Sequence, residues 1–362
     1  RFFQNKTLKS GDTYSFKTYE PSISRMIDMT VKVGGLETVD IFGTLGKLRK
    51  VELIAEPFKY VDQQKNQRVM KLPPVTLWVN KKGIVEQRST EIPGLGAVHF
   101  TRTTKATAMK PGVGTSQLTD LGLQSMIRVD KRLYKPHSKN KIVYRITVKG
   151  DSDAKTALAS DSRQTITNAN GESFDLTVQA IREPKGDGEK KAPKEYLANC
   201  YFLNCDDARI QRYAKEAIGS ATDPWEKAKR IERWVYRYMR TDNSVPFNTA
   251  GQVARQLRGD CRQHAMLAAA MCRAAGVPSK TAVGLVYVQP RYGKPLFGFH
   301  MWIEVWIKGQ WLALDGTRGE GGIGAAHIKV ADHSWYDTQS LTPMLPVARV
   351  LGKLDIKIVE AK

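Results

Sequence analysis

The spacing of apolar residues changes partway along the chain, from a period of two to a period near 3.6. Before about residue 182, β-branched and aromatic residues alternate with polar ones in short runs, which predicts antiparallel strands with one solvated face. We therefore expect residues 1–182 to be a β-rich N-terminal region, with a division into two subdomains near residue 110 as an alternative. The clearest runs are Met29–Val33, Val75–Val79, Lys141–Val148 and Phe174–Val178.

The segment 183–194 has no apolar periodicity and is rich in Gly, Pro and charged residues, so it is predicted to be a solvated linker. After it, Asp223 and Pro224 form a helix-start signal before an amphipathic stretch that reaches Met239. The period of this stretch indicates that the second half of the chain contains helices.

A further helix is predicted from Cys261 to Ala275, with Asp260 as its cap and Gly276 just past its end. Residues 195–362 should therefore fold as an α+β domain in which this helix precedes an antiparallel sheet. The strand-like runs that follow the helix are Thr281–Val288, His300–Ile307 and Gln310–Leu314.

Cys261 is the first candidate for chemistry, because it lies in the first turn of a predicted helix. Free backbone N–H groups and the positive end of the helix dipole favour a thiolate there, and a thiolate is the nucleophilic form of cysteine. The same N–H groups could stabilise an oxyanion after attack on a carbonyl. The alternative is that Cys261 is a small buried residue of an alanine-rich helix.

His300 and Asp315 are candidate partners for this thiol. His300 begins one strand and Asp315 ends the next, and Lys308-Gly309 between them predicts a tight turn. A hairpin would bring the imidazole and the carboxylate together, as a base and its orienting group require. The alternative is a solvent-facing histidine and an aspartate that caps a turn.

Two further residues are candidates for lining the site. His264 lies three residues after Cys261 on the same helical face, but the helix dipole disfavours an imidazolium there, so a structural or substrate-lining role is expected. Trp302 shares a strand face with His300 and could line a cleft or pack in the core.

The net charge of +21 suggests attraction to an anionic surface or polymer. The excess is spread along the chain, with 33 basic against 20 acidic residues in 1–192 and 24 against 16 in 193–362. The chain lacks finger, ribonucleoprotein and basic-region motifs, so nucleic acid is a weak alternative. No window approaches the roughly 20 apolar residues that a membrane-spanning helix requires.

Four cysteines are too few for a disulfide scaffold, and their spacing does not match a zinc site. Cys200 and Cys205 are close enough in sequence to form a bridge or to remain two thiols. Cys272, deep in the alanine-rich helix, is expected in the core.

Three sequence blocks together resemble the bacterial transglutaminase-like superfamily. They are Gly259-Asp-Cys-Arg-Gln-His through Arg273-Ala-Ala-Gly-Val-Pro278, Phe299-His-Met-Trp-Ile-Glu-Val305, and Trp311-Leu-Ala-Leu-Asp-Gly-Thr317. They occur in the family's order, and the resemblance covers about residues 223–318. The N-terminal half also resembles the β-rich companion domain of some bacterial members, in its general strand-like pattern more than in any motif.

This resemblance implies a papain-like α+β core with Cys261 as nucleophile, His300 as general base and Asp315 as its orienting carboxylate. It implies no metal and no cofactor. The family usually has an oxyanion-stabilising side chain upstream of the cysteine, and Asn248, Gln252 and Gln256 all remain candidates. Gly316 stands where proline is common after the aspartate, which loosens that turn.

The resulting functional hypothesis is an acyl-transfer enzyme that acts on amide or peptide bonds of a protein or peptide through a Cys261 thioester. Hydrolysis is expected, with transamidation as the runner-up. A noncatalytic module that binds an anionic polymer is the alternative from another class. Because the sequence opens at Arg1, we also expect a removed leader, tag or anchor and a periplasmic or secreted location.

Overall fold

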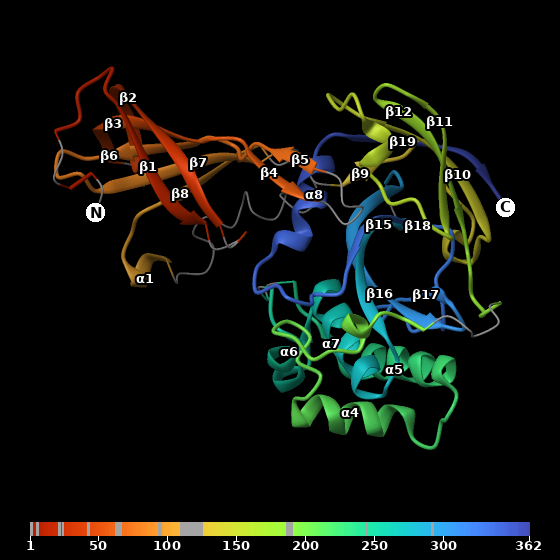
Figure 1. The fold of residues 1–362 in the computed structure, drawn as a ribbon. Helices are drawn as coiled ribbons and strands as arrows, with labels where there is room; N and C mark the ends of the chain where they lie inside the picture. The colour runs from red at the N-terminus through yellow and green to blue at the C-terminus, as the bar shows by residue number, and fades with distance from the viewer. Residues whose placement is uncertain are drawn as a thin grey trace. The chain divides into compact units, whose positions relative to one another are not determined.

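The computed structural model describes residues 3–4, 7–20, 23, 25–41, 44–61, 67–92, 96–108, 126–185, 191–243, 245, 247–290 and 293–362. Two compact units are present, one over residues 1–125 and one over residues 126–362. The predicted α+β class is confirmed, with mostly antiparallel sheets in both units (Figure 1). Within the described residues, no helix is long and apolar enough to cross a bilayer.

The first unit is a twisted antiparallel sheet with strand order β1-β2-β3-β6-β7-β8. A small core from its central strands contains Val31, Val33, Val51, Leu77 and Val79. The elements are β1 (Thr13–Glu20), β2 (Arg25–Ile41), β3 (Thr44–Ala55), β4 (Phe58–Val61), β5 (Gln67–Met70), β6 (Val75–Val79), β7 (Val85–Ile92), β8 (Gly96–Thr101) and α1 (Lys105–Ala108).

The second unit begins with strands that sequence periodicity assigned to the N-terminal region. Its first elements are β9 (Ile127–Arg128), η2 (Pro136–Ser138), β10 (Lys141–Val148), η3 (Ala154–Thr156), β11 (Gln164–Asn170) and β12 (Ser173–Gln179). Strand β10 pairs with β12 on one side and with the final strand, β19 (Leu354–Ala361), on the other. Residues on both sides of the predicted linker therefore share one sheet.

The division between compact units at residues 125 and 126 thus differs from the predicted boundary at 183–194. Pairing of β10 with β19 joins residues about 200 positions apart, and alternation within a strand carries no information on such a distant partner. The alternative division near residue 110, and linker residues 186–190, lie outside the described residues.

The remaining elements build the helical layer and a second sheet. They are η4 (Lys194–Tyr196), α4 (Ala208–Ile218), α5 (Pro224–Tyr238), β13 (Arg240–Thr241), α6 (Ala250–Gln256), β14 (Arg258–Gly259), α7 (Cys261–Ala274), β15 (Ser279–Val288), β16 (Leu296–Ile307), β17 (Gln310–Leu314), β18 (His327–His333), η5 (Thr342–Met344) and α8 (Leu345–Val350). The sheet order is β17-β16-β15-β18, and β9 also pairs with β16.

Strand β16 connects the two hydrophobic cores of this unit. Its C-terminal part, from Met301 to Ile307, packs with α4, α5, α6 and α7, which gather beside β16 and β17 in Figure 1. Near its start, Phe297 packs with the core of β10, β12 and β19. His300 lies between these two stretches, so both cores fix the position of its backbone.

Candidate active site

Cys261 is the first residue of α7, as predicted. The Asp260 side chain accepts a hydrogen bond from Arg262 N at 2.9 Å, and Gln263 Oε1 accepts one from Asp260 N at 3.0 Å. This capping box fixes the helix start. Gly259 is required before it, because φ is 148° and an added Cβ would lie 2.5 Å from the Gln263 side chain. Cys261 is half-buried, at the positive end of the helix.

The hairpin of β16 and β17 brings His300 and Asp315 together. Its turn residues, Lys308 and Gly309, have φ values of 48° and 80°, as a two-residue hairpin turn requires. Trp306 faces Trp311 across the turn, and Ile303 faces Leu314. At the open end, His300 Nε2 donates a hydrogen bond to Asp315 Oδ2 at 2.8 Å, which leaves Nδ1 for the thiol.

The Asp315 carboxylate is completely buried, with 1% exposure, and both oxygens accept hydrogen bonds. Oδ1 accepts from the Thr317 backbone N–H at 2.9 Å and from the Thr317 hydroxyl at 2.7 Å. Oδ2 accepts from His300 and also from His327 Nε2 at 3.1 Å. These donors orient the carboxylate before any substrate binds.

Glu232 of α5 holds the backbone beneath Asp315. Its Oε1 accepts from Asp315 N at 2.9 Å, and its Oε2 accepts from Gly321 N at 2.7 Å. Sequence reasoning missed both Glu232 and His327. A signal for Glu232 exists, since it lies seven residues after Trp225 on the buried face of its helix, but no periodic signal marks His327.

Residues 211–316 match the sequence profile described as the transglutaminase-like superfamily. These residues are a transglutaminase-like domain. The match includes all of the three sequence blocks that predicted this family except the last residue, Thr317, so that prediction is confirmed.

Relatives of the transglutaminase-like domain are distant. An uncharacterized protein of Haemophilus influenzae is 27% identical over 157 residues, which cover 36% of this chain and 42% of that protein. The chain therefore spans less than half the length of this relative. A candidate cysteine protease from Cytophaga hutchinsonii has a TM-score of 0.40 at 16% identity, over 60% of this chain and 83% of that one. The periplasmic domain of TgpA from Pseudomonas aeruginosa has a TM-score of 0.29 at 14% identity, over 50% and 89%.

Charge in the transglutaminase-like domain is arranged to keep His300 protonated. Burial lowers the pKa of His300, but the charge of Asp315, its hydrogen bond and interaction with the Cys261 sulfur outweigh this effect and raise the pKa to about 10. Burial also raises the pKa of Asp315, yet His300 and His327 hold it well below its usual range. An imidazolium thus lies between an ionised carboxylate and the thiol.

A cleft of about 470 Å³ opens beside His300 in the second unit. The cleft is lined by Pro136, His137, residues 286–289, His300, Asp315, Thr317 and Arg318. The side chain of His300 is therefore reached from this cleft. Arg318 also pairs with Glu320 at 2.6 Å.

The two predicted lining residues are both buried. His264 is 4% exposed, and its Nδ1–H donates to the Asp260 carbonyl oxygen at 2.7 Å, which braces the first turn of α7. Burial lowers its pKa, which favours the neutral ring. Trp302 is fully buried with Ala282, Ala313 and Ile323, and its ring stacks on His300 with 6.3 Å between centroids. Trp302 therefore supports the imidazole from within the protein.

The three candidate oxyanion donors lie in or beside α6. The Gln252 amide oxygen accepts from Thr249 N at 2.9 Å in the capping box of that helix. The Gln256 amide oxygen accepts from Arg258 Nε at 3.4 Å. Asn248 is half-buried. Neither of these two hydrogen bonds has Cys261 as a partner. The contacts of the described residues therefore do not select one donor, and all three remain candidates.

The other three cysteines, Cys200, Cys205 and Cys272, are free thiols. Cys272 is fully buried, and burial raises its pKa, in agreement with its predicted place in the core. Cys200 and Cys205 are both unbridged, and Arg273 donates a hydrogen bond to the Cys200 sulfur at 3.7 Å.

One group among the described residues has the spacing that a metal ion needs. One ring nitrogen each of His300 and His327 and a carboxylate oxygen of Asp315 lie within 4.8 Å of one another. Distances of 2.8 and 3.1 Å to Oδ2 are those of hydrogen bonds, and Thr317 occupies Oδ1. We therefore assign the group as a hydrogen-bonded cluster.

Proposed function

We propose that this protein is a cysteine-dependent acyl-transfer enzyme that acts on amide or peptide bonds, with Cys261 as nucleophile, His300 as acid and base, and Asp315 as orienting carboxylate. The observation that carries the proposal is the placement of His300 between the Cys261 sulfur and a buried, ionised Asp315. An imidazolium in that position favours negative charge on the sulfur.

In the first step, the Cys261 sulfur attacks the carbonyl carbon of the substrate. His300 passes its proton to the departing amine nitrogen, the C–N bond breaks and a thioester forms. The positive end of the α7 dipole at Cys261 stabilises the oxyanion of the tetrahedral intermediate. In the second step, water attacks the thioester carbon and gives a proton to His300, and the sulfur leaves as thiolate.

We infer that the substrate is a protein or peptide segment bound in the cleft beside His300, and that water is the usual acyl acceptor. The half-buried position of Cys261 and the cleft at His300 support access of water to the thioester. Transamidation would need an amine to outcompete that water. We further propose a periplasmic or secreted location, which cell fractionation with an antibody would test.

The first test is alkylation with iodoacetamide from pH 5 to 8, read at each cysteine by peptide mass spectrometry. We expect Cys261 to react fastest at low pH, and the His300→Ala variant to lose this advantage. Cys200 is the internal control, because it is also half-buried. His99→Ala, at an exposed histidine of β8, is the matched variant and should behave like wild type. Equal labelling of Cys200 and Cys261 would contradict the proposal.

The second test separates the two acyl acceptors. Unfolded casein would be incubated in H₂¹⁸O with a biotinylated primary amine, with Cys261→Ala as control. Cysteine-dependent incorporation of ¹⁸O at new carboxyl groups supports hydrolysis. Dominant incorporation of the amine would instead assign transamidation.

A further inference from the structure

Asp315 has a second histidine partner on a different strand. His327, the first residue of β18, donates from Nε2 to the same oxygen, Oδ2, that accepts from His300. The His327 side chain is 1% exposed. Its Nδ1 is buried and has no hydrogen-bond partner among the described residues. Its polar contact is thus directed at the carboxylate that orients the proposed base.

We propose that His327 is a positioning residue that holds the Asp315 carboxylate toward His300 through its Nε2–H donor. The proposal rests on the acyl-transfer function proposed above and adds a fourth residue, which acts through Asp315 and not on the substrate.

The neutral state of the His327 ring follows from what surrounds it. Trp302 lies 5.5 Å from it, His300 5.8 Å and His137 5.7 Å, between ring centroids. Burial lowers the pKa of His327 to about 3. The charges of His300 and Arg163 lower it further, and these effects together outweigh the hydrogen bond and charge of Asp315, which raise it. A neutral donor binds the carboxylate without adding a charge that would repel the His300 imidazolium.

Small residues in β15 make this contact between distant strands feasible. Strand β15 separates β16 from β18, and Gly284 faces both His300 and Lys329 in its register. An added Cβ at Gly284 would lie 2.0 Å from the Ile328 carbonyl oxygen and 2.9 Å from the Trp302 ring. The register also shifts between Val283 and Gly284. These features allow β18 to approach β16 closely enough for His327 to reach Asp315.

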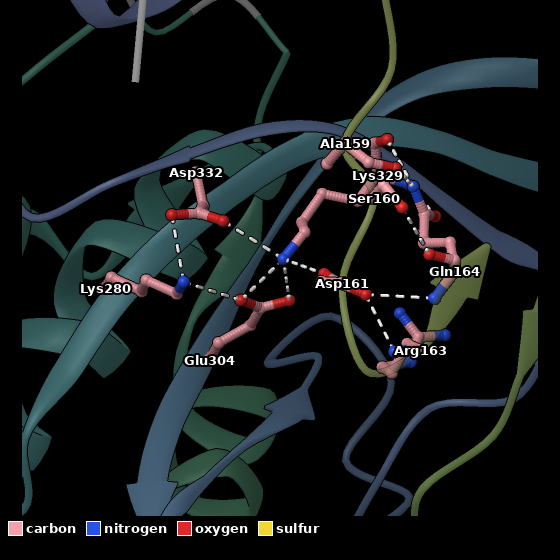
Figure 2. Close-up of polar contacts among 9 residues, drawn as sticks. All are labelled: Ala159, Ser160, Asp161, Arg163, Gln164, Lys280, Glu304, Lys329 and Asp332. Carbon is pink, nitrogen blue, oxygen red and sulfur yellow. Dashed lines mark hydrogen bonds and ion pairs between the residues drawn. The ribbon is translucent and has the colours of Figure 1, made fainter. Parts of the chain in front are cut away.

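A buried ion cluster fixes β18 two residues after His327 (Figure 2). Lys329 Nζ lies 3.0 Å from both carboxylate oxygens of Glu304 on β16 and 3.0 Å from Asp332, and it also pairs with Asp161. The Gln164 amide accepts from Lys329 N at 2.7 Å and donates to Lys329 O at 2.8 Å. The Lys329–Glu304 pair spans β15 and ties β18 to the strand that carries His300.

The test compares His327→Leu, which removes the donor, with His327→Gln, whose amide N–H can take the place of Nε2–H. Loss of a hydrogen bond to a charged group should slow pH 6 alkylation of Cys261 by about 10- to 100-fold in the Leu variant. The Gln variant should recover most of that rate. His333→Leu is the matched control, because His333 is also on β18 but accepts from Trp335 N. Equal rates in the Leu variant and wild type would overturn the proposal.

A second measurement requires neither enzyme activity nor correct folding of the variants. In wild-type protein with ¹⁵N-labelled histidine, NMR should show His327 as the Nε2–H tautomer with an unprotonated Nδ1, unchanged from pH 5 to 8. An Nδ1–H tautomer, or titration within this range, would overturn the proposal. The two proposals can fail separately. Cys261 labelling that does not depend on His300 would contradict the proposed function. The His327 tautomer tests the hydrogen bond from His327 to Asp315, whatever the result of the labelling.

Discussion

His300 Nε2 lies 2.8 Å from Asp315 Oδ2, and the carboxylate of this pair is 1% exposed. A charged hydrogen bond in such a site is stronger than one in water, because little solvent screens it. The pair therefore controls both the orientation of the imidazole and its proton affinity. The predictions below follow from this pair and from the groups that support it.

Replacement of Asp315 by asparagine should lower the rate of the proposed reaction by roughly 1000-fold or more, as when an orienting carboxylate is lost from a triad. The charge that raises the pKa of His300 to about 10 is then absent, so that pKa falls. Cys261 alkylation should depend on the His300 imidazolium only below the pKa of His300. In the Asn variant this dependence should therefore end at a lower pH than in wild type. Asp28→Asn, at an exposed pair with Lys17, is the control, and a similar loss of rate there would point to a nonspecific effect.

Glu232 should make stability depend on pH. Burial raises its pKa to about 7, although hydrogen bonds from Asp315 N and Gly321 N oppose this. A carboxyl whose folded pKa is raised stabilises the fold below its unfolded value and loses that contribution as pH rises through the folded value. The free energy of unfolding should therefore fall by on the order of 3 kcal/mol between about pH 4.5 and 7. Denaturant titrations of wild type and Glu232→Gln check this, since the variant should show a flatter dependence.

Gly284→Ala should destabilise the second unit, because the new methyl would meet the Ile328 carbonyl, a backbone group that cannot move alone. Overpacking of this kind costs about 1–3 kcal/mol or more. Gly298→Ala on the neighbouring strand β16 is the control, since nothing lies within 4 Å of its added Cβ. Thermal unfolding of both variants is the measurement, and equal shifts in Tm would contradict the close approach of β18.

Lys329→Met should be strongly destabilising, by about 3–5 kcal/mol. The buried carboxylate of Glu304 would lose one of the two lysine charges, Lys280 and Lys329, that pair with it. Lys17→Met removes an exposed ion pair with Asp28 and should change stability by less than about 1 kcal/mol. The free energies of unfolding of the two variants, from denaturant titration, provide the comparison. A cost near zero for Lys329→Met would show that the cluster does not anchor β18.

The sequence alone determined the features that depend on neighbouring residues. Asp260 and Gly259 identify the start of the helix that carries Cys261, because capping involves residues within one turn. Lys308-Gly309 identifies the hairpin that joins the strands of His300 and Asp315, because a two-residue turn sets the register on both sides. The three blocks that predicted the family lie in these local elements.

Only the tertiary structure decided which distant strands meet. The pairing of β10 with β19 places residues 141–148 in the second unit, and no local pattern specifies that partner. His327 contacts Asp315 across the sheet, where Gly284 leaves room for β18 and Lys329 pairs with Glu304 of β16. Such contacts depend on the packing of strands far apart in sequence, whereas hydrophobic periodicity reports only which face of a strand is buried.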